Sequence, residues 1–161
     1  MLSELTLAFV VVVVCVLIHT AGLVSAAEWL IERRERFERR RPGMMRFSLY
    51  LILVFSVVTG LHLTETAVWA VVYQWWGLFP DFETSLYFSM GSYTTIGYGD
   101  VVLPQRWRLL GAVEGTSGVL LCGLSTAFIF VVLNTLIQLR VAAGRQVGGR
   151  GRPRPAKGVD R

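Results

Sequence analysis

The chain has 161 residues, of which 53% are hydrophobic and 17% are charged, and its mean hydropathy is +0.54. A soluble domain usually carries about 45–50% apolar and about 25% charged residues, so this composition excludes an ordinary soluble domain. Long apolar runs alternate with Arg-rich blocks, as in a membrane protein with basic loops. Three membrane-spanning helices would use most of the chain and leave no room for a nucleotide-binding or kinase domain. We attribute the net charge of +5 to topology and to contact with anionic lipid, and expect no nucleic acid partner.

The first apolar segment, residues 5–27, contains no charged residue. At about 1.5 Å per residue, a helix of this length measures about 34 Å, which is enough to cross the hydrocarbon core. A cleavable signal peptide is the alternative, because residues 24–27 resemble a small-residue cleavage site. The residues before the segment include Glu4 but no Lys or Arg, and an Arg-rich block follows it, so both flanks favour a retained transmembrane helix.

The Arg-rich block that follows the first apolar segment is interleaved with Glu at a spacing of four residues. This pattern predicts that the first helix continues into solvent and ends near Pro42 and Gly43. A voltage sensor is the alternative, but its arginines would have to lie inside an apolar helix. We therefore assign residues 1–44 to an N-terminal transmembrane helix with a basic cytoplasmic extension.

Residues 45–140 contain two further apolar segments, and we assign them to one domain. The first predicts one long, tilted helix at about 45–76, with a break at Thr59–Gly60 as the alternative. The second predicts a helix at about 105–139. Residues 141–161 are rich in Gly, Pro and Arg, and we predict that they form a disordered basic tail.

The distribution of Arg and Lys predicts the orientation of the helices. Nearly all of these residues lie in 28–46 and in 140–161, so the positive-inside rule places both regions in the cytoplasm. The N-terminus then lies outside, and residues 77–105 form an extracellular loop. We expect a multi-pass protein of the plasma membrane, which is the inner membrane in a bacterial cell.

The extracellular loop contains a short helix signal followed by an unusual turn sequence. Pro80 and Asp81 mark a helix start, with Asp81 as the N-cap, and the apolar content predicts a helix at about 82–94. This helix is too short to cross a membrane, so it must enter and return. The chain then reads Thr-Thr-Ile-Gly-Tyr-Gly-Asp over residues 94–100.

The sequence of residues 94–100 is suited to binding a dehydrated cation. Backbone carbonyls can replace the hydration shell of an alkali ion if successive oxygens point to the same side, and Gly97 and Gly99 are spaced to adopt the positive φ angles that this requires. Thr95 can add a hydroxyl, and we expect the ring of Tyr98 to pack outward and support the oxygens. The negative end of the preceding helix dipole favours a cation nearby.

Residues 94–100 resemble the signature of the potassium-channel pore-domain superfamily. The resemblance covers residues 47–140, in the order outer helix, pore helix, filter and inner helix, and the additional N-terminal helix resembles that of small bacterial ion-channel proteins. It implies an all-α membrane protein with three transmembrane helices and a re-entrant pore helix, assembled as a homotetramer. K⁺ is then the permeant ion, and no cofactor is expected. The filter, residues 95–99, would bind K⁺ through Thr95, Ile96, Gly97 and Tyr98, supported by Gly99, Asp100 and Thr94.

The sequence also departs from the family pattern. Tyr87 and Phe88 replace a common Trp pair, which alters the aromatic surroundings of the filter. Family members often carry a carboxylate behind the filter in the pore helix, and this pore helix has none there. We therefore expect Asp100 to lack that partner.

The inner helix carries two candidate gating residues. Gly118 resembles the gating-hinge glycine of the family, and close packing by a small residue is the alternative. One helical face, predicted to line the ion cavity, comprises Val119, Cys122, Thr126, Phe130 and Asn134. Phe130 could narrow the inner mouth, and the alternative is that this face packs on the outer helix.

Three ionisable residues, His62, Glu65 and Glu114, lie near membrane depth, where charge is costly and usually paired. We expect them to form one polar contact between the outer and inner helices. This contact would be a proton-sensitive gate, a static hydrogen-bonded clamp, or a set of residues exposed at the outer interface. For His19, on the first helix, we expect a structural role with its hydrogen bonds satisfied.

These features together predict a potassium-selective ion channel. A nonselective cation channel and a nonconducting membrane adaptor with a lipid-binding basic tail are the alternatives. We do not expect an enzyme, because the sequence shows neither a nucleophile–base constellation nor a metal-ligand cluster.

Overall fold

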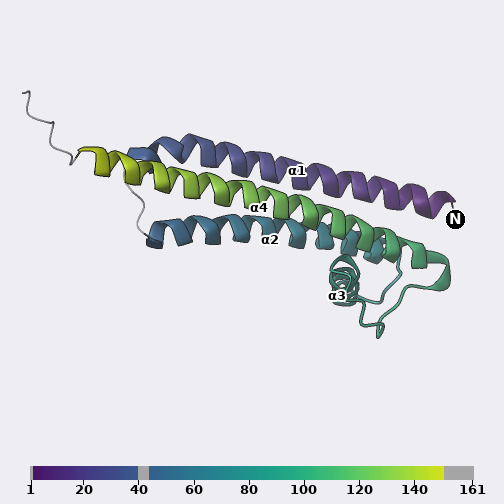
Figure 1. Ribbon diagram of the computed structural model, residues 1–161. Helices are drawn as coiled ribbons and strands as arrows, with labels where there is room; N and C mark the ends of the chain where they lie inside the picture. The colour runs from purple at the N-terminus through teal and green to yellow at the C-terminus, as the bar shows by residue number, and fades with distance from the viewer. Residues whose placement is uncertain (1, 40–43, 151–161) are drawn as a thin grey trace, which may run out of the picture.

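A computed structural model describes residues 2–39 and 44–150. Within these ranges the elements are α1 (Leu2–Arg39), α2 (Met44–Trp75), α3 (Phe82–Tyr93), the short 3₁₀ helix η1 (Gln105–Trp107) and α4 (Arg108–Arg150). The long helices α1, α2 and α4 lie side by side, and α3 packs across one end of them, the end that also carries the N-terminus (Figure 1). Segments of all three are long and apolar enough to cross a membrane: Ser3–Glu32, Met44–Trp75 and Gln105–Val141. The expected all-α membrane fold is confirmed.

Helix α2 is a single long helix, without the alternative break at Thr59–Gly60. The hydroxyl of Thr64 donates to the carbonyl of Gly60 at 2.8 Å, so the polar side chain near the glycine is satisfied within the helix. The uninterrupted helix reaches from Met44 to Trp75, where the sequence predicts 45–76. It can therefore contact α1, α3 and α4 along its length.

Helix α1 packs closely against α2 and α4 rather than standing apart from them. A Cβ atom built at Gly22 would lie 2.4 Å from Cδ2 of Leu61, so α1 and α2 approach closely there and a larger residue would displace the Leu61 side chain. Near its start, α1 is tied to η1, which precedes α4, because Nε of Arg106 donates to Oε1 of Glu4 at 2.7 Å. The additional helix is therefore an integral part of the described bundle.

Helix α4 extends to Arg150, beyond the predicted end near residue 139. The prediction of disorder from residue 141 is therefore wrong for residues 141–150, and residues 151–161 lie outside the described residues. The reason lies in how helices grow: extending an existing helix requires no new nucleation, and residues 141–147 contain Ala, Arg and Gln, which are good helix formers.

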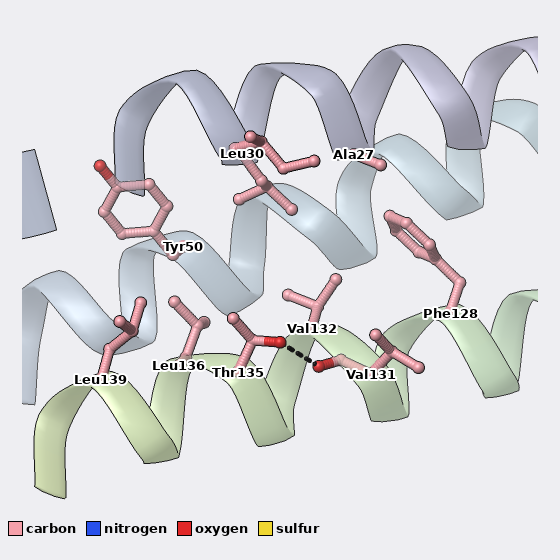
Figure 2. A pocket seen from close by; sticks show the side chains of 10 residues that line it. Ala27, Leu30, Tyr50, Phe128, Val131, Val132, Thr135, Leu136 and Leu139 are labelled. Carbon is pink, nitrogen blue, oxygen red and sulfur yellow. Dashed lines mark hydrogen bonds between the residues drawn. The ribbon is translucent and has the colours of Figure 1, made fainter. Parts of the chain in front are cut away.

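The end of the bundle remote from α3 holds an apolar cavity of about 280 Å³ between α1, α2 and α4. Figure 2 shows its lining, which includes Ala27, Leu30, Tyr50, Phe128, Val132 and Leu136. The hydroxyl of Thr135 is satisfied there by the carbonyl of Val131 at 2.9 Å. This cavity offers almost no polar atoms, which makes it unsuitable for binding an ion.

Candidate functional site

Helix α3 begins as the sequence predicts. Oδ1 of Asp81 accepts a hydrogen bond from the amide of Thr84 at 2.7 Å, which satisfies one of the free amides at the helix start. This bond holds the pKa of Asp81 below its ordinary value. At the other end, the amides of Thr94 and Thr95 donate to Met90 and Ser92 and close the last turn. The helix is therefore capped at both ends, and its fixed C-terminal end sets the position at which residues 94–100 begin.

The backbone of residues 94–100, called here the signature segment, alternates in handedness. The φ angles of Thr95, Gly97 and Gly99 are +61°, +53° and +82°. Positive φ at every second residue turns successive carbonyl oxygens toward one side, which an ordinary strand does not do. Gly97 and Gly99 take the conformation expected of them, whereas the positive φ of Thr95 was not expected. A non-glycine residue held in this region costs about 1–3 kcal/mol, and such strain is found most often at functional sites.

The signature segment is anchored on one side and uncovered on the other. The amide of Gly97 donates to the carbonyl of Gly91 at 3.0 Å, which ties the segment to α3. All residues of the segment are exposed in the single chain, including Ile96 at 57% and Tyr98 at 70%. The described part of the chain therefore leaves this face open.

Aromatic residues support the outer end of the signature segment. The rings of Tyr87 and Tyr98 stack with their centroids 6.3 Å apart and their planes 9° apart, so Tyr98 packs against α3. The hydroxyl of Tyr87 donates to Oδ2 of Asp100 at 2.8 Å, and this acceptor raises the pKa of Tyr87. Asp100 thus has a partner on α3 that was not expected from the sequence, a tyrosine hydroxyl rather than a carboxylate.

Two buried carboxylates hold the inner face of α3, and the first is Glu114 of α4. It accepts hydrogen bonds from the hydroxyl of Tyr73 on α2 at 2.6 Å and from the hydroxyl of Ser89 on α3 at 2.5 Å. All three side chains are fully buried. Because an unsatisfied buried carboxylate is costly, these two donors fix the relative positions of α2, α3 and α4.

The second carboxylate, Glu65 of α2, belongs to a larger group that we call the His–Glu cluster. It consists of His19, His62, Glu65, Tyr93 and Ser125, one or two residues from each of the four α-helices. Glu65 accepts from the hydroxyl of Tyr93 at the end of α3 and lies 2.7 Å from Nδ1 of His19. Ser125 Oγ lies between the two imidazoles, 2.9 Å from Nε2 of His19 and 3.1 Å from Nε2 of His62.

The predicted single contact of His62, Glu65 and Glu114 is therefore wrong. The structure brings His62 and Glu65 together and places Glu114 in the separate group with Tyr73 and Ser89. The physical reason is that α3 offers one hydroxyl to each carboxylate. Ser89 and Tyr93 are four residues apart on one helical face, and they bond to Glu114 and Glu65 respectively.

His19 is satisfied, as expected, but it also brings the first helix into a group of potential metal ligands. The sequence showed no metal-ligand cluster because His19 and Glu65 lie 46 positions apart. In the fold, ligand atoms of His19, His62 and Glu65 all lie within 4.8 Å of one another. His19 points at α2 because of the rotation of α1 about its axis, and the sequence does not specify this rotation.

Glycines of α4 allow the end of α3 to approach closely. A Cβ atom built at Gly118 would lie 2.2 Å from the carbonyl oxygen of Tyr93, and one at Gly115 would lie 2.9 Å from that of Ser92. Helix α4 passes through both positions without interruption. Gly118 thus has the close-packing role that was the alternative to a hinge.

The predicted cavity-lining face of α4 is not covered by α2. Its residues Val119, Cys122, Thr126, Phe130 and Asn134 are all exposed in the single chain, Phe130 to 64%. The alternative that this face packs on the outer helix is therefore wrong. In the single chain, both this face of α4 and the signature segment thus lack cover.

These observations define a multi-pass α-helical membrane protein whose short helix presents a strained carbonyl-bearing segment. The family model described as an ion channel matches residues 50–135, just over half of the chain. The chain therefore belongs to this ion channel family. Comparisons with curated proteins and with solved structures find no match.

Proposed function

We propose that this chain forms a homotetrameric channel that conducts K⁺ in preference to Na⁺. The ions would be coordinated by the carbonyls of Thr95, Ile96, Gly97 and Tyr98 and by the hydroxyl of Thr95. Selectivity by carbonyl oxygens that replace the hydration shell is the principle at work in such filters. K⁺ is then the permeant ion, no cofactor takes part, and the protein acts by passive conduction rather than as an enzyme.

The observation that carries the proposal is the alternation of φ along the signature segment, with positive values at Thr95, Gly97 and Gly99. Two further features support it. One chain supplies only one strand of carbonyls, and its open face would be shared among four copies around an axis. The exposed face of α4 would then line the cavity below, with Phe130 at its inner part.

Charge supports a particular orientation and a lipid partner. The basic blocks after the first and third spans would lie in the cytoplasm, and the N-terminus and the signature segment outside. Glu4 and Arg106 are bonded at one end of the bundle, which agrees with both lying on the same side of the membrane. The basic C-terminal region would contact anionic lipid of the plasma membrane, or of the inner membrane in a bacterium.

The proposal is tested by K⁺ flux from liposomes that contain the purified protein. Gly97→Ala should abolish flux, because an L-residue at φ +53° is strained even though no atom lies within 4 Å of the added methyl group. Gly123→Ala is the matched control, since Gly123 has an ordinary helical φ and equally open space. Wild-type protein without flux would favour the nonconducting adaptor, and normal flux through Gly97→Ala would contradict the proposed filter.

A further inference from the structure

The His–Glu cluster contains both histidines of the chain. His19 comes from α1 and His62 from α2, and they meet over Glu65, which lies one turn after His62 on the same face of α2. His19 and Glu65 are fully buried, and the side chain of His62 is 21% exposed, so one edge of the cluster is open. The ring centroids of the two imidazoles are 5.1 Å apart.

Both imidazoles have the same orientation relative to their polar neighbours. Nδ1 of His19 lies 2.7 Å from Oε1 of Glu65, and Nδ1 of His62 lies 3.4 Å from Oε2 of the same carboxylate. Both Nε2 atoms face Oγ of Ser125, at 2.9 and 3.1 Å. Two imidazoles that turn one nitrogen to a common centre and the other to an orienting group are typical of metal sites, where the second nitrogen fixes the ring.

The cluster has fewer hydrogens to donate than it has hydrogen-bond contacts, so it can take up one more proton or a cation. The contacts are His19–Glu65, His19–Ser125, His62–Ser125, His62–Tyr93 and Tyr93–Glu65. With both imidazoles neutral, each of the two histidines, Ser125 and Tyr93 has one hydrogen to donate, and one contact lacks a donor. A second proton on one imidazole would complete the set, and so would a cation between the two Nδ1 atoms and the carboxylate.

We propose that the His–Glu cluster is a binding site for a divalent transition-metal ion, with zinc as the best-suited probe. Nδ1 of His19, Nδ1 of His62 and the carboxylate of Glu65 would be its ligands. Two imidazoles and a carboxylate suit zinc and its neighbours, whereas Ca²⁺ and Mg²⁺ prefer six or more oxygens. Ligands of a tetrahedral zinc ion lie about 3.4 Å apart, and one ligand atom from each of these three residues already lies within 4.8 Å of those of the other two.

Tyr93 and Ser125 complete the site. The hydroxyl of Tyr93 bonds to Glu65 and lies 2.9 Å from Nδ1 of His62, which places an oxygen at the fourth position. Ser125 Oγ can accept from both Nε2–H groups at once, because a hydroxyl has two lone pairs. A bound ion would link α1 to α2 and to the end of α3, immediately before the signature segment.

Zinc binding is measured on the full-length protein purified without a histidine tag and treated with a chelator. After dialysis against ZnCl₂, the wild type should retain about one zinc ion per chain, and its melting temperature should be higher than that of the same protein in chelator. Bound Co²⁺ should show the intense visible bands of a tetrahedral site. His19→Gln and Glu65→Gln should lose the metal, whereas Glu114→Gln, which changes a buried carboxylate outside the cluster, should keep it.

The variants are first compared in chelator by size exclusion, so that a loss of metal is not mistaken for a loss of fold. If His19→Gln does not fold, the Co²⁺ spectrum and zinc content of the wild type decide alone. Wild-type protein that retains no zinc would overturn the proposal and leave a second proton as the occupant of the cluster. Full zinc retention by His19→Gln or an octahedral Co²⁺ spectrum would also overturn it. Ion flux is not a readout here, so these outcomes are independent of the proposed conduction.

Discussion

Replacing Gly118 with Ala adds one methyl group where α4 touches the end of α3. The new Cβ atom would lie 2.2 Å from the carbonyl oxygen of Tyr93, while ordinary contacts begin at about 3.4 Å. The obstructing atom belongs to the backbone and cannot rotate away as a side chain could. The two helices must therefore separate by roughly 1 Å. This separation also disturbs the bonds that join Tyr93 to Glu65 and His62 within the His–Glu cluster.

The size of the effect follows from two opposing contributions. Overpacking of this kind costs about 1–3 kcal/mol, and a rigid backbone neighbour places Gly118→Ala at the upper end. Ala is intrinsically better than Gly in a helix by about 1 kcal/mol, so the net loss should be about 2 kcal/mol per chain. Gly123→Ala is the matched change in the same helix, and because no atom lies within 4 Å it should gain up to about 1 kcal/mol.

The two variants are compared by unfolding in mixed micelles with increasing SDS, followed by tryptophan fluorescence. The account predicts that the free energies of unfolding of Gly118→Ala and Gly123→Ala differ by about 3 kcal/mol. Equal stabilities would refute the packing argument. If Gly118 acts as a hinge instead, Gly118→Ala should alter opening while leaving the stability near that of the wild type.

Two other predictions concern the buried carboxylate and the topology. Glu114→Leu should lower the free energy of unfolding by about 1–3 kcal/mol, because the buried hydroxyl of Tyr73 would lose its acceptor; unchanged stability would show that this bond contributes little. A cysteine introduced by Ser3→Cys should react with an impermeant thiol reagent applied outside the cell, and one introduced by Ala156→Cys should not. Wild-type protein is the control for reaction at Cys15 and Cys122. The reverse pattern would contradict the proposed orientation.

The parts of the site that depend on local chemistry could be predicted from the sequence. Asp81 caps α3 because its carboxylate lies within reach of an amide three residues later, whatever the rest of the fold does. Gly97 and Gly99 take positive φ because glycine carries no penalty there. Thr95 was not predicted to do so, since its strain is imposed by the surrounding structure rather than by its own preference.

The contacts between helices could not be predicted in the same way. Depth along the membrane suggested that Glu114 and His62 lie at a similar level, but the rotation of each helix and the position of α3 determine which side chains meet. Glu114 instead meets Ser89, and Glu65 meets Tyr93 and His19. The sequence did contain one indication of these contacts. Ser89 and Tyr93 are polar residues four apart on a helix that has to be buried, and buried hydroxyls need hydrogen-bond partners.

The central claim is that the signature segment selects K⁺ by means of its backbone carbonyls, and the reversal potential under bi-ionic conditions tests it most directly. Purified protein is placed in a planar bilayer with KCl on one side and NaCl at equal concentration on the other. The account predicts a reversal potential displaced toward that of K⁺, so that the K⁺ permeability exceeds the Na⁺ permeability. A reversal potential near zero would show a nonselective pore and would contradict the account.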